Sequence, residues 1–374
     1  MGAVRSSRRP RALRRPASLD RRRRSADLCC WRGLLCARPR LARRASRDGI
    51  DAGHCRSPRF PVPDPSCACH QPANDCRPVW RIGATMAHAP SDTGGLMRIP
   101  WKLKSLVFAI LDATHAGGLL AWLQKHVTRR SRVAFSTLSP DWLFHESVIE
   151  LSPGKRLLEF GAGKSLVQNL YLSQVCRSQT VVDIVPLFDR QLANEAAQRI
   201  SYITGRDLPP ITSLADLAAL NISYIAPLDV ARSALPDNAF DVCVSTNTME
   251  HIPEAQLGAI LVELRRILVP GGLVSAIIDY SDHYSHTDPS IGRLNFLRFS
   301  DAEFRRFNHR SHFQNRLRHH DYERLFRDAG FVVERDEVLG WAELPDAISC
   351  DDPRRRDPTF AATAGRFVAR SPGR

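Results

Sequence analysis

Short apolar runs alternate with longer amphipathic segments along the second half of the chain. Residues 156–161, 180–185, 222–226 and 240–246 are apolar runs of strand length, each bounded by turn residues. Between several of them the apolar positions recur every three or four residues, which is the spacing of a helix with one buried face. Strands that alternate with helices in this way predict an α/β fold with a parallel sheet.

The remaining elements follow from the same periods and from turn residues. A helix is expected over 164–175, after the first strand, and Pro270, Gly271 and Gly272 predict a turn before a fifth strand. The other expected elements are a helix from Leu257 to Leu268, strand five over 273–279, a helix over 322–329 stopped by Gly330, strand six over 331–334 and a last strand over 359–369.

A longer apolar run, residues 106–123, precedes these elements and lies between basic residues within the segment 98–132. Eighteen residues is the lower limit for a membrane span, and Asp112 and the pair Gly117-Gly118 interrupt this run. We therefore expect one or two helices that cover a substrate cleft. A peripheral contact with a membrane surface through 98–132 is the alternative.

Charge changes the picture only at the N-terminus. Residues 1–85 hold 20 Arg, no Lys and six acidic residues, which accounts for the whole net charge of +14; the rest of the chain has 33 basic and 33 acidic residues. This first segment shows no apolar period, so we predict a disordered Arg/Pro/Cys-rich extension over residues 1–96. The overall charge therefore gives no reason to expect a nucleic-acid partner.

Other interpretations of the extension stay open. It could be an RNA-binding arm, a transit peptide or a zinc site made of Cys67, Cys69, His70 and Cys76. A further hypothesis is that the physiological start lies at Met86 or Met97, because the composition changes abruptly there. The three cysteines beyond residue 85 form no disulfide framework, which predicts a reducing, cytoplasmic compartment.

A glycine turn, Gly161-Ala162-Gly163, closes the first strand. Such a turn lets a ligand approach bare backbone beside the positive end of a helix. A P-loop is excluded because its first glycine would fall at Leu158, and a dinucleotide fingerprint is weakened because its third small residue would fall at Leu166.

The stretch Glu159-Phe160-Gly161-Ala162-Gly163 resembles motif I of the class I S-adenosylmethionine-dependent methyltransferases. Later landmarks follow in the order of that family, from about residue 155 to 369: Phe240-Asp241 opening strand four, Glu250-His251 after it, and Pro270-Gly271-Gly272. The resemblance implies a Rossmann-like α/β fold, with a seven-stranded, mostly parallel sheet in the order 3-2-1-4-5-7-6. Helices would cover both faces, with a helical cap over 97–150 and the catalytic domain over 151–374.

The resemblance also implies S-adenosylmethionine as the cofactor. Asp183, at the end of the second strand, would accept the ribose hydroxyls. Asp229 would lie beside the adenine, and Asn247, Glu250 and His251 would line the cleft. The full set of expected cofactor residues is Glu159, Gly161, Ala162, Gly163, Asp183, Ile184, Asp229, Val230 and Asn247.

The acceptor would meet the polar loop 279–288 that follows the fifth strand. Methyl transfer to a hydroxyl requires a base, and we favour His283, with Asp279 and His251 as the other candidate catalytic residues. The same loop could instead bind a divalent metal or be an ordinary polar loop, and we assign no metal ligand. The expected reaction is O-methylation of a small-molecule or glycan/lipid-linked acceptor.

An Arg- and Phe-rich segment, 295–318, is expected to form an amphipathic lid helix over 304–318. Alternatively, this segment could bind an anionic acceptor or stack on RNA. Two other functions use the same features: an NAD(P)-dependent oxidoreductase or epimerase would also use Asp183, and a non-catalytic, membrane-associated binding module is favoured by 98–132 alone. The sequence leaves the oligomeric state open.

Overall fold

The computed structural model describes residues 99–114, 133, 135–346, 348 and 352–373. All of them belong to the second of the two compact units into which the chain divides, Arg81–Arg374. The predicted disordered extension, the Cys67–Cys76 zinc alternative and most of the segment after Asp112 up to 132 lie outside the described residues.

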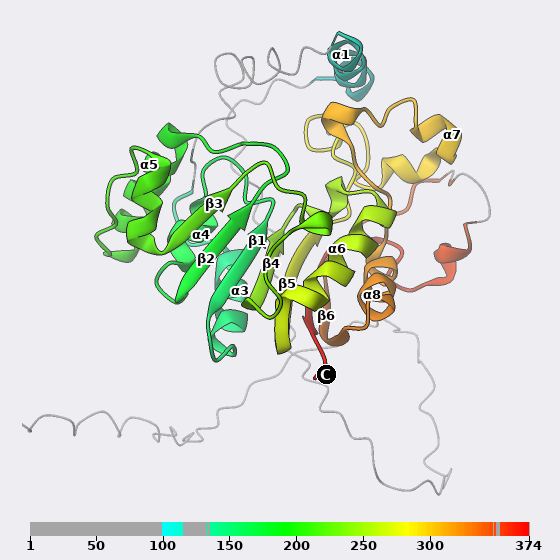
Figure 1. Cartoon of the computed structure of the whole chain (residues 1–374). Coiled ribbons are helices and arrows are strands. Elements are labelled where there is room, and N and C mark those ends of the chain that lie inside the picture. The colour runs from blue at the N-terminus through cyan, green and yellow to red at the C-terminus, as the bar shows by residue number, and fades with distance from the viewer. Residues whose placement is uncertain (1–98, 115–132, 134, 347, 349–351, 374) are drawn as a thin grey trace, which may run out of the picture. The chain divides into compact units, whose positions relative to one another are not determined.

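One seven-stranded sheet forms the centre of this unit (Figure 1). Its order is β3-β2-β1-β4-β5-β7-β6, with β7 antiparallel to β5 and β6, which confirms the predicted fold. The strands are β1 (Arg156–Phe160), β2 (Ser178–Val182), β3 (Ile222–Ile225), β4 (Phe240–Thr246), β5 (Leu268–Asp279), β6 (Val332–Trp341) and β7 (Ala362–Arg370).

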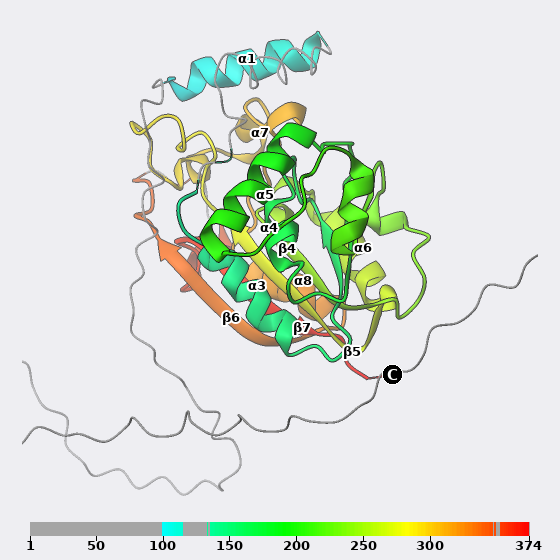
Figure 2. The same ribbon diagram turned by 90° about the vertical axis from the view of Figure 1, so that its left-hand side faces the viewer.

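Helices cover both faces of the sheet (Figures 1 and 2). α3 (Pro140–Glu150), α4 (Val167–Leu172) and α5 (Arg190–Thr204) pack on one face. α6 (Glu254–Ile267) and α8 (His319–Asp328) pack on the other. α1 (Trp101–Ala113) and α7 (Asp301–Phe304) lie near the carboxyl ends of the parallel strands.

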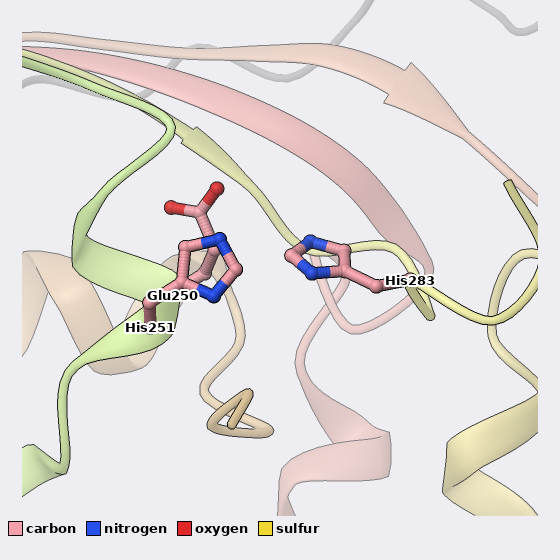
Figure 3. Close-up of side chains that lie close together, drawn as sticks. All are labelled: Glu250, His251 and His283. Carbon is pink, nitrogen blue, oxygen red and sulfur yellow. The ribbon is translucent and has the colours of Figure 1, made fainter. Parts of the chain in front are cut away.

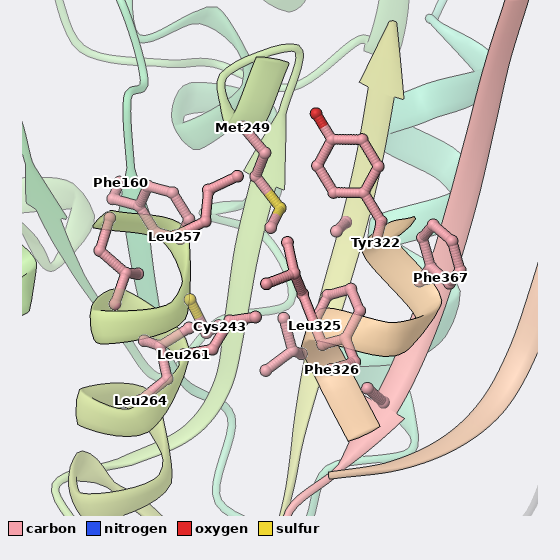
Figure 4. Close-up of a cluster of buried hydrophobic side chains, with 14 of the residues drawn as sticks. Phe160, Cys243, Met249, Leu257, Leu261, Leu264, Tyr322, Leu325, Phe326 and Phe367 are labelled. Carbon is pink, nitrogen blue, oxygen red and sulfur yellow. The ribbon is translucent and has the colours of Figure 1, made fainter. Parts of the chain in front are cut away.

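Adjacent residues of the central strands supply two separate hydrophobic cores. Leu157 and Val242 face α3 to α5, whereas Leu158 and Cys243 belong to the core beside α6 and α8, and all four side chains are fully buried. Figure 4 shows Cys243 in this second core. This alternation is the two-residue period of a strand that is covered on both faces. It explains why these strands are continuous apolar runs in the sequence.

Several expected elements differ in their bounds from the structure; strand six, expected over 331–334, extends to Trp341 as β6. The helix expected over 164–175 spans only Val167–Leu172, and it begins no earlier than Val167 because Leu166 has a left-handed backbone (φ 50°) that cannot belong to a right-handed helix. The turn expected at Pro270-Gly271-Gly272 lies inside β5, as an irregularity between the pairs Phe240–Leu268 and Val242–Leu273.

The lid helix expected over 304–318 is wrong. Within this segment only Phe304, the last residue of α7, and a single 3-10 turn, Arg310–His312, are helical, and the next helix, α8, begins at His319. Its last arginine explains why: Arg318 is fully buried and donates to the carbonyl oxygens of Tyr280, Phe360 and Ala362. A side chain that binds three carbonyls in the interior cannot lie on the solvated face of an amphipathic helix.

α1 packs against the loop that follows β5. The Trp101 backbone N–H donates to Asp288 Oδ2 (2.7 Å), and the Phe108 ring stacks on His312 at 4.5 Å between centroids. α3 lies within the segment 97–150 expected to form the cap, but it packs on the sheet. Among the described residues no helix is both long and apolar enough to cross a membrane.

Candidate active site

The glycine turn after β1 has the backbone that its sequence predicts. Gly161 and Gly163 both have left-handed φ angles, 79° and 74°. A Cβ on Gly161 would lie 2.3 Å from Thr248 Cγ2, whereas a Cβ on Gly163 would meet no described atom within 4 Å. Thr248 also donates to the Gly161 carbonyl (3.1 Å), which joins the loop after β1 to the loop after β4. The turn therefore needs Gly161 for packing and leaves space at Gly163.

Asp183 lies directly after β2, beside this turn. Its Oδ2 accepts a hydrogen bond from the Tyr224 hydroxyl (2.9 Å), and burial raises the pKa of the carboxyl, opposed by that hydrogen bond. The next residue, Ile184, is 68% exposed although it is apolar. A carboxylate and an exposed apolar side chain lie together here, as a ribose and an adenine ring would require.

The expected cofactor residues Asp229, Val230 and Asn247 differ in which of their groups a ligand could reach. Asp229 is exposed and accepts from the Ala231 backbone N–H (3.0 Å). Val230 has its side chain buried in the core beside α6, so it can offer a ligand its backbone and not its side chain. Asn247 is exposed and has a left-handed φ of 48° at the end of β4.

Glu159 is buried and held from within the protein. It accepts from Gln168 Nε2 (2.9 Å) and Asn169 Nδ2 (2.7 Å), both on α4. Burial raises the pKa of the carboxyl to about 7, although these two hydrogen bonds lower it. Its position explains the acidic residue before the glycine turn: Glu159 fixes α4 against β1 and so fixes the turn between them.

A chain of buried polar side chains extends this arrangement to α3 and β5. Thr246 donates to Gln168 Oε1 (3.0 Å), so it must accept from His145 Nε2 (2.8 Å), and His145 Nδ1 then accepts from Ser275 (2.7 Å). The hydrogen bonds thus run in one direction, from Ser275 through His145, Thr246 and Gln168 to Glu159. His145 could not be found from the sequence, because a single histidine among the mixed apolar and acidic residues of α3 belongs to no motif.

The candidate catalytic residues come together at the carboxyl ends of β4 and β5. Asp279 Oδ2 lies 3.6 Å from His283 Nε2 and 3.4 Å from His286 Nε2. The His251 and His283 rings are 4.8 Å apart between centroids. The structure therefore places His283, Asp279 and His251 in one group, together with His286.

Burial controls the charge of this group. It lowers the pKa of His283 to about 3, against the opposing effect of Asp279, so the ring is neutral near pH 7. Burial would raise the pKa of Asp279, but hydrogen bonds from His286 and Ser281 outweigh it and the pKa falls to about 2. A carboxylate thus faces an imidazole that is neutral near pH 7.

Glu250 lies beside these histidines, on the same 3-10 turn as His251 (Figure 3). Its side chain is buried, and burial raises its pKa well above the usual range. Oε2 of this carboxyl has no hydrogen-bond partner among the described residues. From the sequence, Glu250 is expected only to line the cleft.

A family model described as a methyltransferase domain matches residues 143–335, just over half of the 374 residues. The chain belongs to this methyltransferase family. Its methyl donor is S-adenosylmethionine, and the enzyme is an S-adenosylmethionine-dependent methyltransferase. The match begins within α3, so the family's domain includes the helix that carries His145.

The methyltransferase is also similar to solved structures. These include a SAM-dependent methyltransferase from Methanosarcina mazei (12% identity, 64% of this chain, 100% of that chain, TM-score 0.36) and one from Mesorhizobium loti (13%, 60%, 95%, 0.33). The [4+2]-cyclase SpnF is a third (13%, 73%, 96%, 0.39). A search of curated proteins returned no matching sequence.

The residues around the glycine turn fit S-adenosylmethionine. The Gly163 position is open, Asp183 offers a carboxylate, and Ile184 offers an exposed apolar surface. These features lie at the carboxyl ends of β1 and β2, the edge at which α/β sheets bind ligands.

Proposed function

We propose that the methyltransferase O-methylates a small-molecule or glycan/lipid-linked acceptor, and that His283 accepts the proton of the acceptor hydroxyl. The observation that carries the proposal is the neutral, buried His283 ring beside the Asp279 carboxylate. Asp279 holds the ring and stabilises the imidazolium that proton transfer creates. His251 lines the same space.

The cofactor supplies a methyl group on a sulfonium, which needs no nucleophilic side chain of the protein. We propose that Glu159, Gly161, Ala162 and Gly163 form the turn that receives it, that Asp183 and Ile184 bind its ribose and adenine, and that Asp229, Val230 and Asn247 complete the site. The protein then contributes alignment and proton transfer, the two effects that His283 and its neighbours support.

The test measures S-adenosylhomocysteine release with panels of sugar nucleotides, lipid-linked saccharides and small phenols. With the best acceptor, His283→Ala should lower kcat by about 10²–10⁴-fold and leave S-adenosylhomocysteine affinity within about twofold. His286→Ala removes a more exposed histidine beside the same carboxylate and serves as the matched control, with a smaller loss. Equal losses of turnover and cofactor affinity in His283→Ala would assign His283 a packing role.

We also propose a peripheral contact of α1 with the cytoplasmic face of a membrane, where a lipid-linked acceptor would be found. One face of α1 packs on the acceptor loop. The other exposes Leu103, Leu106, Val107 and Ile110, which are spaced as one helical stripe. Lys102, also exposed, adds positive charge beside this stripe, which favours anionic lipids.

A further inference from the structure

We infer that Glu250, His251 and His283 form a binding site for one divalent transition-metal ion such as Zn²⁺ or Co²⁺. One ligand atom from each side chain lies within 4.8 Å of the other two (Figure 3). Glu250 and His251 are neighbours on the turn after β4, and His283 comes from the loop after β5. Two loops at the same edge of the sheet thus bring two imidazoles and a carboxylate together.

The carboxylate of Glu250 gives independent support. The side chain is only 2% exposed, and its Oε2 has no hydrogen-bond partner within the part of the chain that the structure describes. Buried polar atoms in native proteins are nearly always satisfied, so an unsatisfied carboxylate oxygen indicates a missing partner. A cation between Glu250 and the two rings would be that partner.

His251 is already oriented as a metal ligand. Its Nδ1 lies 2.8 Å from the Phe313 carbonyl oxygen, which can only accept, so Nδ1 carries the proton and Nε2 of the neutral ring carries the lone pair. Metal-binding histidines ordinarily donate their second ring N–H to a carbonyl or carboxylate in this way. Asp279, 3.6 Å from His283 Nε2, brings a second carboxylate next to the cluster.

The donor set selects the class of ion. Mg²⁺ and Ca²⁺ prefer oxygen ligands, whereas two imidazoles and one carboxylate suit Zn²⁺, Co²⁺ or Fe²⁺. In a tetrahedral shell with bonds of about 2.1 Å, ligand atoms lie about 3.4 Å apart, so small side-chain rotations would close the site. Three protein ligands leave one position open, as in catalytic rather than structural zinc sites.

Metal binding goes beyond the proposed function and does not depend on it, because it needs neither cofactor nor acceptor. It does have a consequence for the site. A ring nitrogen of His283 that binds the ion cannot also accept a proton. The ion would therefore replace an imidazole base by a Lewis acid that can bind an acceptor oxygen at its open position.

The test titrates Co²⁺ alone into the chelator-treated, untagged full chain and follows the visible absorption of the bound ion. Co²⁺ bound to cysteine thiolates elsewhere in the chain is distinguished from this site by its intense near-ultraviolet charge-transfer band. The wild-type protein should bind one more Co²⁺ by imidazole and carboxylate ligands than Glu250→Gln or His251→Asn. At that site each variant should lose affinity by at least the roughly 10–100-fold that loss of a supporting residue costs.

The matched control is His320→Asn, which removes a half-buried histidine placed between Asp321 and Asp357, outside the cluster. It should bind Co²⁺ like the wild-type protein. His251 is exposed, so its variant should fold even where Glu250→Gln does not, and S-adenosylhomocysteine-induced thermal shifts verify the fold of each. Equal Co²⁺ binding in wild type and His251→Asn, or loss in His320→Asn alone, would overturn the inference.

Discussion

Gly161 and Gly163 share a left-handed backbone and differ in their surroundings. Any side chain at either position costs about 1–2 kcal/mol of backbone strain. At Gly161 an added methyl group would also collide with Thr248, and such overpacking costs about a further 1–3 kcal/mol of stability. At Gly163 the methyl group would face open space. The two glycines thus separate the strain of the turn from its packing.

Gly161→Ala should therefore lower the free energy of unfolding of the ligand-free protein by about 1–3 kcal/mol more than Gly163→Ala does. Urea denaturation of both variants measures the difference. Gly163→Ala is the matched control, since its backbone strain is the same. Equal losses in the two variants would show that Thr248 moves away at no cost.

At this scale the sequence predicted which residues gather at the site better than what each side chain does there. Asp183 could be located because a carboxylate after the second strand follows from the order of motifs. The burial of Val230 depends on α6, which is distant in the sequence, and the partners of Glu159 lie on α4, whose bounds differ from those of the expected helix. Neither could therefore be predicted from the sequence. Which of these residues touch the cofactor remains a prediction.

Among the elements, α3 shows how a buried polar group determines pH dependence. Burial lowers the pKa of His145 to about 3 from 6.5. Between pH 6.5 and about pH 3 the unfolded chain therefore binds a proton at His145 that the folded protein does not bind. Stability from this residue is complete above pH 6.5 and is lost as the pH falls toward 3.

His145→Gln should remove this loss. Between pH 6 and pH 4 the wild-type protein should lose up to about 1.4 kcal/mol per pH unit more than the variant does. At pH 7 the variant should be less stable by about 1–3 kcal/mol, because the hydrogen bonds to Ser275 and Thr246 are disturbed. Urea midpoints across this pH range measure both effects, with His320→Gln as the control. A pH dependence that is unchanged in His145→Gln would contradict the assignment.

The strands could be predicted from the sequence and the path of the 304–318 segment could not, because the two depend on different kinds of contact. The central strands β1 and β4 are buried on both faces, so their apolar runs are visible in the sequence. The segment 304–318 is held by side chains that reach backbone carbonyls far along the chain, as Arg316 reaches Phe296 and Phe299. Such contacts leave no periodic pattern.

For the whole molecule, the surface of α1 points to a partner and the net charge does not. The charge of +14 resides in residues 1–85, outside the described part, whereas α1 exposes an apolar stripe next to the acceptor loop. The order of the sheet could be predicted because the motifs follow one another along the chain in a fixed sequence. The partner of α1 could not, because its two faces are both apolar and only the structure shows which is covered.

The double variant Leu106→Gln/Ile110→Gln should bind anionic phosphatidylglycerol vesicles at least about tenfold more weakly than the wild-type protein, at about 1 kcal/mol or more for each side chain that enters the lipid. Vesicle co-sedimentation measures the affinity. Val262→Gln, which replaces an equally exposed apolar residue on α6, is the control and should bind like wild type. Unchanged binding by the double variant would remove α1 from the contact.

Arg318 has a consequence for the design of new acceptor specificity. Its guanidinium holds the first residue after β5, Tyr280, together with Phe360 and Ala362 at the start of β7. An acceptor loop grafted from another enzyme would lose this anchor if it were exchanged alone. The smallest portable piece is therefore the whole span from 280 to 362, which brings along the arginine and all three carbonyls that it binds.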